Sequence, residues 1–323
     1  MADFAQTSQR CRARARYTKK GHSHLLQGRR SVYRFIEANR DIYSVEKMCS
    51  VLNASSCCFY RWLVRPESPG EHRSKMLVEK IQKVHMNSGC IYGSPRITAE
   101  LHKEGEPVSR SYVARLMKKH GIRSKVKKKY KITTDSSHSY RIAENLLQRD
   151  FSADALSQKW VGDITYIHTN KGWLYLRTVI DLADRKVVGW SLSTDMTAEN
   201  TSVTAIKMAV KNRGVKKGLI FHSDRGVQYA CEEFRAVLRK NNITQSMSRK
   251  ANCWDNAVAE SFFKSLKAEM VYHRKFIDQQ SAKLEIFGYI EGFYNTRRTH
   301  SALGYKTPKQ MEEMLLEKEK LAA

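Results

Sequence analysis

Hydrophobic side chains recur at helical spacing in the first part of the chain and at strand spacing after Trp160. In residues 31–66, apolar side chains repeat at helical spacing over 32–36 and again over 45–52. A turn of small and capping residues follows, Asn53 to Ser56, and then a short segment, Cys58 to Leu63. This order is the outline of a helix-turn-helix module, and an ordinary helical hairpin gives the same pattern. Residues 31–66 are therefore predicted to be helical. They are either a helix-turn-helix module or an ordinary helical hairpin.

A second helical module is predicted over residues 75–130. Helices are expected over 75–86, 96–103 and 112–120, and Ser109 precedes the last of them as a capping residue. The outward positions of that last helix are basic, where side chains that contact DNA phosphates would lie. These positions are Arg110, Arg115, Lys118 and Lys119.

Three stretches around these modules lack hydrophobic periodicity. Residues 1–30 are rich in Arg, Gln, Ser and His and are predicted to be a flexible basic arm. A lysine run follows the last predicted helix of the second module, which favours contact with a DNA backbone over a merely solvated face. Residues 131–150 have few apolar side chains and are predicted to be a linker. The run is Lys127, Lys128 and Lys129.

From Trp160 the hydrophobic period changes from 3.6 to 2. Strands are predicted over 161–168, 173–182 and 187–193, and then over 218–223 and 243–246. Helices are predicted over 198–212, 231–241, 255–271 and 279–296, and residues 313–323 are expected to be a C-terminal tail. This order predicts an α/β fold over residues 151–312, with a mixed five-stranded sheet flanked by helices, as in ribonuclease H. Small all-α helix-turn-helix modules are expected to precede it.

The charge of the chain indicates an anionic partner. The 323 residues carry a net charge of +26, and residues 1–150 hold 31 Lys and Arg against 13 Asp and Glu. Such a surplus repels itself unless a polyanion relieves it, and nucleic acid is the commonest one. No apolar stretch is long enough for a membrane span, and no secretory signal is visible. The seven cysteines are odd in number and have no CxxC spacing, which favours reduced thiols in a cytosol.

Three carboxylates stand at positions that need an explanation. Asp163 lies inside a predicted strand, where burial of a charge is costly. Asp224 follows an apolar strand at the point where the chain leaves the sheet, and ligand sites collect at such ends. Glu260 lies on a predicted helix whose apolar stripe lets its polar face meet the sheet. Sixty residues separate the first pair and 35 the second. The sequence therefore predicts one acidic site.

The sequence segments around these residues resemble the motifs of a known protein family. The segments HSDRGVQY at His222, SMSRK at Ser246, DNAVAESFF at Asp255 and YNTRRTHSALGY at Tyr294 stand close to its motifs. Together with the acidic spacing they resemble the second-frame (OrfB) transposases of the insertion-sequence family numbered three. These are DDE recombinases with a core like that of retroviral integrases, and the likeness covers roughly residues 40–312.

This resemblance implies DNA cleavage and strand transfer at the ends of an insertion sequence. Asp163, Asp224 and Glu260 would be both the catalytic residues and the ligands of two Mg²⁺ ions, and Mn²⁺ could substitute. Asp163 would bridge both ions, with Asp224 on one and Glu260 on the other. Oxygen ligands suit such hard cations, and a metal pair activates the attacking oxygen and stabilises the leaving one.

Several other residues are candidates for DNA contact or packing. The resemblance gives Lys267 a place against transposon-end phosphates, while Lys264 has an equally good interpretation as a helix-surface lysine. Arg249 and Lys250 lie in a polar loop and are predicted to contact DNA. Trp160 and Trp254 are expected to be packing anchors, with base stacking as the alternative. His222 is expected to be a structural core histidine, with orientation of Asp224 as the alternative. The sequence leaves the roles of four C-terminal residues open: Tyr294, Arg297, Arg298 and His300.

Two other functions compete with this prediction. A non-catalytic DNA-binding regulator or inhibitor of transposition would need the helical modules but not all three carboxylates. A nuclease without strand transfer would cut DNA but not join it. The predicted partners are double-stranded DNA at the terminal repeats and the target, further copies of the chain on DNA, and an upstream first-frame product with a leucine zipper. The expected location is the bacterial cytoplasm, at the nucleoid.

Overall fold

The computed structural model describes residues 28–65, 68–125, 142–195, 197, 199–249 and 252–322. It divides into two compact units, Met1–Met76 and Leu77–Ala323. Several predictions lie outside the described residues. They are most of the basic arm, the start of the linker, and the predicted DNA contacts Lys127, Lys128, Lys129 and Lys250.

The first unit contains the helices α2 (Arg29–Asn39), α3 (Val45–Val51) and α4 (Ser56–Leu63). Ser55 caps α4, because its side chain accepts a hydrogen bond from the backbone N–H of Cys58. The three helices enclose a small apolar core that includes Phe35, Met48 and Phe59. The helical prediction for this region is confirmed.

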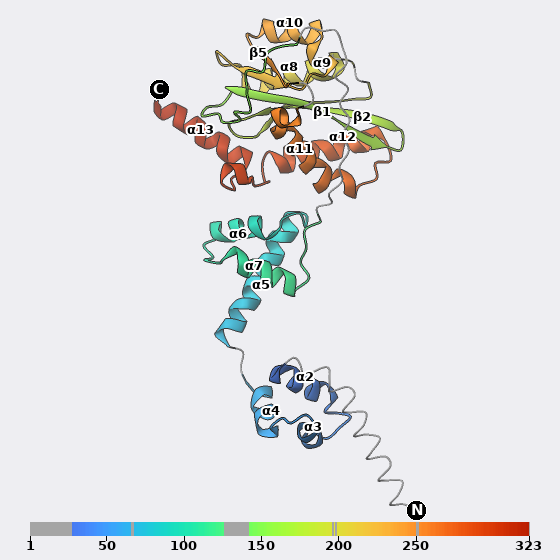
Figure 1. Cartoon of the computed structure of the whole chain (residues 1–323), viewed down its shortest axis with the longest axis vertical. Helices are drawn as coiled ribbons and strands as arrows, with labels where there is room; N and C mark the ends of the chain where they lie inside the picture. The colour runs from blue at the N-terminus through green and yellow to red at the C-terminus, as the bar shows by residue number, and fades with distance from the viewer. Residues whose placement is uncertain are drawn as a thin grey trace, which may run out of the picture. The chain divides into compact units, whose positions relative to one another are not determined.

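A second group of helices begins with α5 (Pro69–Asn87) and continues with α6 (Ser94–Lys103) and α7 (Arg110–Lys119). The predicted cap of α7 is present, since Ser109 accepts from the backbone N–H of Tyr112. Buried apolar side chains from all three helices form one cluster, with Ile81, Ile97 and Val113 at its centre. These helices appear in light blue to green in Figure 1.

The sheet has five strands in the order β3-β2-β1-β4-β5. The hairpin of β1 (Lys159–Thr169) and β2 (Gly172–Asp181) and the next strand, β3 (Val187–Ser193), are antiparallel. The short strands β4 (Ile220–Ser223) and β5 (Thr244–Met247) add to the other side of β1 in parallel. The predicted mixed five-stranded sheet with flanking helices is confirmed.

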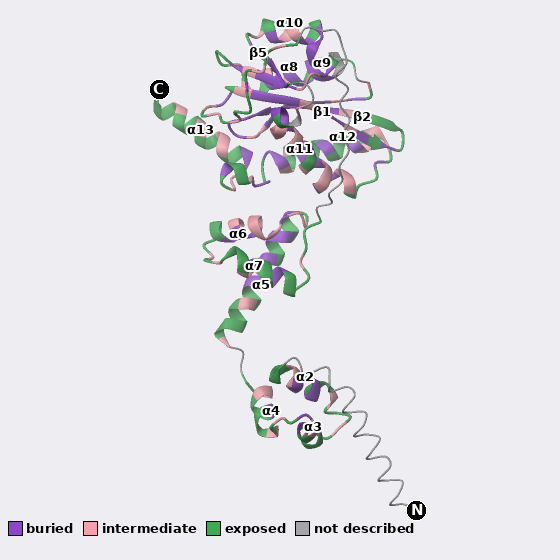
Figure 2. Ribbon diagram, in the orientation of Figure 1, coloured by how far each residue is buried: buried purple, intermediate pink, exposed green. Residues whose placement is uncertain are grey.

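Helices cover both faces of the sheet, and two separate apolar clusters mark the two interfaces. On one face lie η1 (Glu199–Val203, a π-helix), α8 (Thr204–Arg213), α9 (Val227–Ala230) and α10 (Glu232–Lys240). Gly189 of β3 allows α8 to approach closely, because a Cβ there would lie 2.2 Å from the Ala205 carbonyl oxygen. On the other face lie α11 (Ala257–Glu269), α12 (Gln279–Phe287) and η4 (Gly288–Tyr294, a π-helix). Figure 2 shows the strands largely buried between these layers.

Short segments complete this unit. The 3₁₀ helix η2 (Cys253–Asn256) leads into α11, and η3 (Val271–His273) follows it. After η5 (Ser301–Leu303), the chain ends in α13 (Pro308–Ala322). The residues predicted as a C-terminal tail are therefore helical through Ala322, and most of this helix is exposed in Figure 2.

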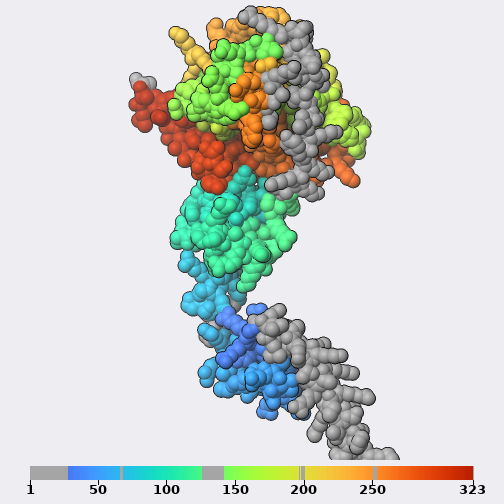
Figure 3. Space-filling model, viewed as in Figure 1, coloured from blue at the N-terminus to red at the C-terminus, as the bar shows by residue number. Residues whose placement is uncertain are grey.

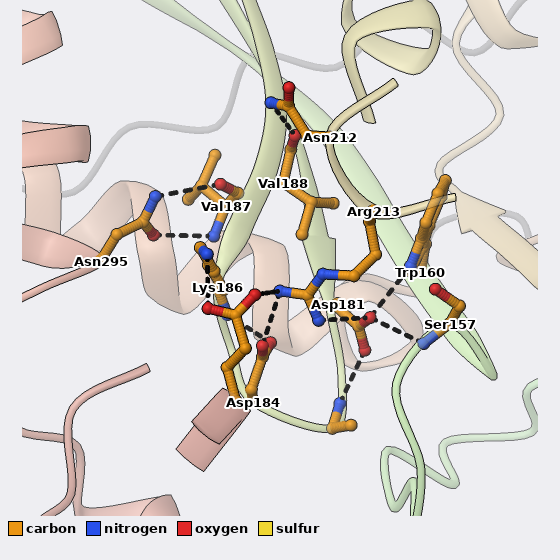
Figure 4. A network of polar contacts seen from close by, with 12 residues as sticks. Ser157, Trp160, Asp181, Asp184, Lys186, Val187, Val188, Asn212, Arg213 and Asn295 are labelled. Atoms are coloured by element: carbon orange, nitrogen blue, oxygen red, sulfur yellow. Dashed lines mark hydrogen bonds and ion pairs between the residues drawn. The ribbon is translucent and has the colours of Figure 1, made fainter. Parts of the chain in front are cut away.

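A buried polar network holds one end of the sheet together (Figure 4). The Arg213 guanidinium at the end of α8 binds Asp184 at 2.7 Å and Asp181 at 3.3 Å. The carboxylate of Asp181 also accepts from the indole N–H of Trp160 at 3.1 Å. Asn295 bonds to both backbone groups of Val187 at 3.0 Å. Trp160 is fully buried, so its prediction as a packing anchor is confirmed.

Candidate active site

Asp163 lies in the middle of β1 and is half-buried. Its Oδ1 accepts a hydrogen bond from the backbone N–H of Ile164 at 2.8 Å. Burial raises the pKa of Asp163 well above its ordinary value, and the charges of Asp224 and Glu260 raise it further. The Lys267 ammonium acts in the opposite direction. Asp163 therefore lies within electrostatic reach of both other predicted carboxylates and of the predicted lysine.

The parallel pairing of β1 and β4 explains how Asp224 comes to lie near Asp163. Val161 pairs with His222 in this ladder, and continuing the same register by two residues brings Asp163 opposite Asp224. Asp224 follows the last residue of β4, and its Oδ1 accepts from the backbone N–H of Gly226 at 3.0 Å. This turn fixes the direction in which the carboxylate leaves the sheet.

Glu260 reaches the same region from α11. The stripe predicted to anchor this helix is buried, with Ala259 and Leu266 fully so. Just before the helix, the Asn256 side-chain amide donates to the Gly162 carbonyl at 3.2 Å, which ties the helix start to the residue before Asp163. The space-filling view shows the orange segment that includes α11 reaching the surface beside the green strand segment (Figure 3).

The donor chemistry of these side chains fits a hard divalent cation. Asp163 and its two acidic neighbours offer only oxygen atoms, and their mutual repulsion is the kind that a bound cation relieves. Among the described residues, no three His, Cys, Asp or Glu side chains are grouped closely enough to hold one metal ion. Magnesium commonly takes only one or two protein carboxylates and completes its shell with water and phosphate oxygens.

The two lysines of α11 differ in their surroundings. The Lys264 ammonium is exposed and forms an ion pair with Glu260 at 3.2 Å, one helical turn away. Lys267 is half-buried, and burial lowers its pKa while the charge of Asp163 raises it. Lys267 therefore belongs to the electrostatic environment of Asp163, whereas Lys264 lies at its rim.

A buried carboxylate that the sequence reasoning missed organises the loop before α11. Asp255 is fully buried and binds the guanidinium groups of Arg249 and Arg149, each at 2.9 Å. It also accepts from the Asn145 amide at 3.0 Å. The hydrogen bonds from Arg249 and the one from Arg149 hold the pKa of Asp255 well below the ordinary range. Arg249, predicted to contact DNA, thus has a structural bond as well as a half-exposed side chain.

The remaining predicted residues divide into exposed and buried ones. The four basic positions of α7 are exposed, as a phosphate-contacting face requires. His222 is fully buried between the hydroxyls of Ser246 and Ser248, and burial lowers its pKa to about 4, which supports a structural role. The packing prediction for Trp254 is wrong, because its side chain is 69% exposed. The exposed positions of α7 are Arg110, Arg115, Lys118 and Lys119.

The C-terminal motif residues mainly serve the fold. Arg298 is buried and binds both carboxylate oxygens of Glu269, at 2.7 and 2.8 Å. Tyr294 is buried as well, while Arg297 is exposed. His300 Nε2 lies 3.1 Å from Arg298 Nη1. Because a guanidinium can only donate, His300 must accept at Nε2 and is therefore neutral.

This neutral histidine predicts a loss of stability on acidification. Burial lowers the pKa of His300 to about 2, and the charge of Arg298 lowers it further. Below pH 6.5 the unfolded chain takes up a proton that the folded chain refuses, so stability falls as the pH falls. Between pH 7 and pH 5 we expect His300 to contribute a loss of about 2 kcal/mol, measured by urea unfolding.

The control for this effect is His300→Gln, which keeps an acceptor for Arg298 but cannot titrate in this range. The variant should lose about 2 kcal/mol less than the parent between the same two pH values. His222, whose pKa is about 4, continues to contribute in both proteins. Equal losses in parent and variant would contradict the assignment of a neutral His300.

Models of two domain families match the sequence of this chain. The integrase core domain matches residues 154–253 and 241–308, and an HTH-like domain matches residues 71–130. The chain is therefore an integrase-core protein with an HTH-like domain before the core. Transposase InsF for insertion sequence IS3A of Escherichia coli K12 is 38% identical over 289 residues, which span 87% of this chain and 98% of that protein. The chain belongs to the family of IS3 insertion-sequence transposases.

Other proteins are also similar to this chain. A 31 kDa protein of insertion element IS600 from Shigella sonnei is 38% identical over 82% of this chain and 97% of its own length. Among solved structures, the simian T-cell lymphotropic virus intasome in complex with PP2A regulatory subunit B56 gamma aligns at 15% identity and a TM-score of 0.41, covering 72% of this chain and 74% of that chain. The HTLV-2 integrase catalytic core domain in complex with magnesium aligns at 17% identity and a TM-score of 0.37, over 49% and 97%.

Among the described residues, no helix is both long and apolar enough to cross a membrane.

Proposed function

We propose that this transposase cleaves DNA at the ends of its insertion sequence and joins the freed ends to a target, with Asp163, Asp224 and Glu260 as the catalytic carboxylates. The observation that carries the proposal is the convergence of a strand, a strand end and a helix on one acidic site. The register of β1 and β4 and the effect of both neighbours on the pKa of Asp163 support it. A core that served only to support DNA binding would have no need for repulsion of this kind.

Two divalent cations fit the proposed site. Asp163 and Asp224 would hold one, and Asp163 and Glu260 the other, with Mg²⁺ as the natural ion and Mn²⁺ as a substitute. Bound in this way, the ions would activate the attacking water or 3′-hydroxyl and stabilise the departing oxygen. Burial raises the pKa of Asp163, and repulsion from Asp224 and Glu260 raises it further; bound ions would offset that repulsion.

The chain's own residues would bind and orient the DNA. Lys267, half-buried within reach of Asp163, would pair with a phosphate beside the reacting bond. Lys264 would exchange its ion pair with Glu260 for a phosphate at the rim. The exposed basic face of α7 would hold duplex DNA at a distance from the chemistry. These contacts position the reacting phosphodiester bond over the carboxylates.

The proposed partners are duplex DNA at the element's ends and at the target, and further copies of the chain assembled on that DNA. An upstream first-frame product with a leucine zipper is proposed as an additional partner for recognition of the ends. The relatives from E. coli K12 support action on bacterial DNA in the cytoplasm, at the nucleoid.

End-labelled duplexes that carry the element's terminal repeats and an unlabelled target plasmid test this proposal. With Mg²⁺ or Mn²⁺ we expect nicked ends followed by joined products, and with EDTA neither. Cleaved but unjoined DNA would indicate a nuclease, and DNA binding without either product would indicate a non-catalytic regulator. Each of these two outcomes contradicts the proposal.

The variant Glu260→Gln tests the site itself. We expect it to lower both products by at least about a hundredfold, equivalent to about 2.7 kcal/mol of barrier, while DNA affinity changes little. Glu285→Gln is the matched control, because Glu285 is a half-exposed carboxylate on α12 that pairs only loosely with Arg274, at 3.8 Å. Loss of DNA binding in Glu260→Gln, or equal activity in the two variants, would remove Glu260 from the proposed site.

A further inference from the structure

Trp254 is an exposed aromatic side chain in the segment that leads to the catalytic helix. Its indole is 69% exposed, although burying a side chain of this size is strongly favourable in water. It lies in η2, six residues before Glu260. No ring partner is found for it among the described residues, whereas the similarly exposed Trp173 packs edge-on against His168. Within the described part of the chain, the indole of Trp254 is therefore exposed and has no aromatic partner.

The backbone on the C-terminal side of Trp254 is firmly held. The next residue, Asp255, is fully buried and bound by Arg249, Arg149 and Asn145. The one after it, Asn256, is buried and donates to the Gly162 carbonyl of β1. Two consecutive buried polar anchors therefore fix the position from which the indole projects. An exposed side chain on a fixed backbone is pre-organised for a ligand, because little freedom remains to be lost on binding.

This position lies at the rim of the acidic site. Gly162, which accepts the bond from Asn256, immediately precedes Asp163. The side chains of Arg149 and Arg249, which hold Asp255, are themselves about half-exposed. Both guanidinium groups are bound to Asp255, the residue next to Trp254. An exposed aromatic side chain together with basic groups is a combination that binds single nucleotides, by stacking on the base and by attraction to the phosphate.

We propose that Trp254 is a binding site for one unstacked nucleobase of the DNA end that enters the active site. This inference rests on the proposed function, since it takes the reacting DNA to lie over the three carboxylates. The indole stacks on the base next to the reacting phosphodiester bond, and Arg149 and Arg249 contact the adjoining phosphates. Holding that base out of the duplex keeps the reacting strand in one position relative to Asp163.

Duplexes that carry 2-aminopurine test this site, because stacking on an indole quenches the fluorescence of that base. The probe is placed in turn at the three nucleotides on each side of the cleaved bond, and the full chain is added in EDTA so that no chemistry occurs. We expect quenching at one position above that of neighbouring positions. Trp254→Ala should abolish it and lower joined products about ten- to hundredfold, and Trp254→Phe should retain part of both.

Trp173→Ala is the control, since Trp173 is also exposed but lies on the β1–β2 hairpin. Its quenching and products should equal those of the parent. Uniform quenching at all positions, or the same local quenching in Trp254→Ala, would overturn the assignment. A change in oligomeric state without a change in quenching would overturn it too, and would make Trp254 a protein contact. If the parent shows local quenching but no metal-dependent products, the proposed function fails and the base site stands.

Discussion

Asp163→Asn is expected to lower DNA cleavage and joining by about 10⁴-fold, or about 5.5 kcal/mol of barrier, and to make the metal-free protein more stable. The loss of activity exceeds that expected for Glu260→Gln because Asp163 is proposed to contact both cations. The gain in stability follows from the raised pKa of Asp163. At neutral pH the unfolded chain carries this carboxylate at no cost, while the folded chain holds the charge beside Asp224 and Glu260 or takes up a proton. Asparagine removes that cost.

Both effects can be measured on the same preparation. The melting temperature in EDTA should rise in Asp163→Asn relative to the parent, and the labelled-end assay in Mg²⁺ should show no products. Asp154→Asn is the control, because Asp154 is an exposed carboxylate of the same unit. It should change neither quantity. An unchanged or lower melting temperature for Asp163→Asn would show that the charge of Asp163 does not destabilise the folded chain. A loss of activity of only about tenfold would exclude contact of Asp163 with both cations.

The part of this molecule that periodicity predicts is the frame of the site. Alternation of apolar residues predicted the strands that hold Asp163 and that end before Asp224, and helical spacing predicted the stripe of Ala259, Phe263 and Leu266 that the structure buries. These strands and this helix depend on residues that are close in sequence. The spacing of apolar residues is therefore enough to predict them. The joint role of the carboxylates at the site was predicted from spacing and resemblance, and stays a prediction.

The part that periodicity could not predict depends on pairs distant in sequence. Asp255 binds Arg149, which is 106 residues away in the sequence. The sequence around either residue does not indicate that the other is its partner. Trp254, the residue before Asp255, is exposed, contrary to the packing prediction. The offset between β1 and β4 is a second example, since sixty intervening residues separate Asp163 from Asp224. A sequence motif can indicate that two distant residues act at one site. The structure is needed to show which residues each of them contacts.

The contact between the HTH-like domain and the core is built in the same long-range way. The Tyr92 hydroxyl donates to the Arg297 carbonyl at 3.2 Å and accepts from the Thr299 backbone N–H at 2.9 Å. Arg96 of α6 lies 3.5 Å from Glu269. Glu269 is the last residue of α11, the helix that carries Glu260 and Lys267. Arg298, which lies between Arg297 and Thr299, also binds Glu269. A change at Glu269 should therefore reach Glu260, one of the proposed catalytic carboxylates, through the helix itself.

Arg298→Met is expected to lower the free energy of unfolding by about 3–5 kcal/mol, because it leaves Glu269 buried without its main partner. Burial alone would raise the pKa of Glu269, and the hydrogen bonds from Arg298 reverse this and lower it. After the substitution, Arg96 and the Tyr289 hydroxyl remain, the latter at 2.7 Å. Urea unfolding at pH 7 measures the loss. Arg297→Met, which alters an exposed neighbour, should cost much less.

The double variant Arg298→Met with Glu269→Leu separates the pair's own contribution from the cost of an orphaned charge. Removing both charges from a buried site is often far less harmful than removing one, so the double variant should recover most of the stability that Arg298→Met loses. Recovery of stability without recovery of strand transfer would show that the pair also sets the position of α11. If the double variant is as unstable as the single one, the loss comes from packing around the guanidinium, and the carboxylate is not the cause.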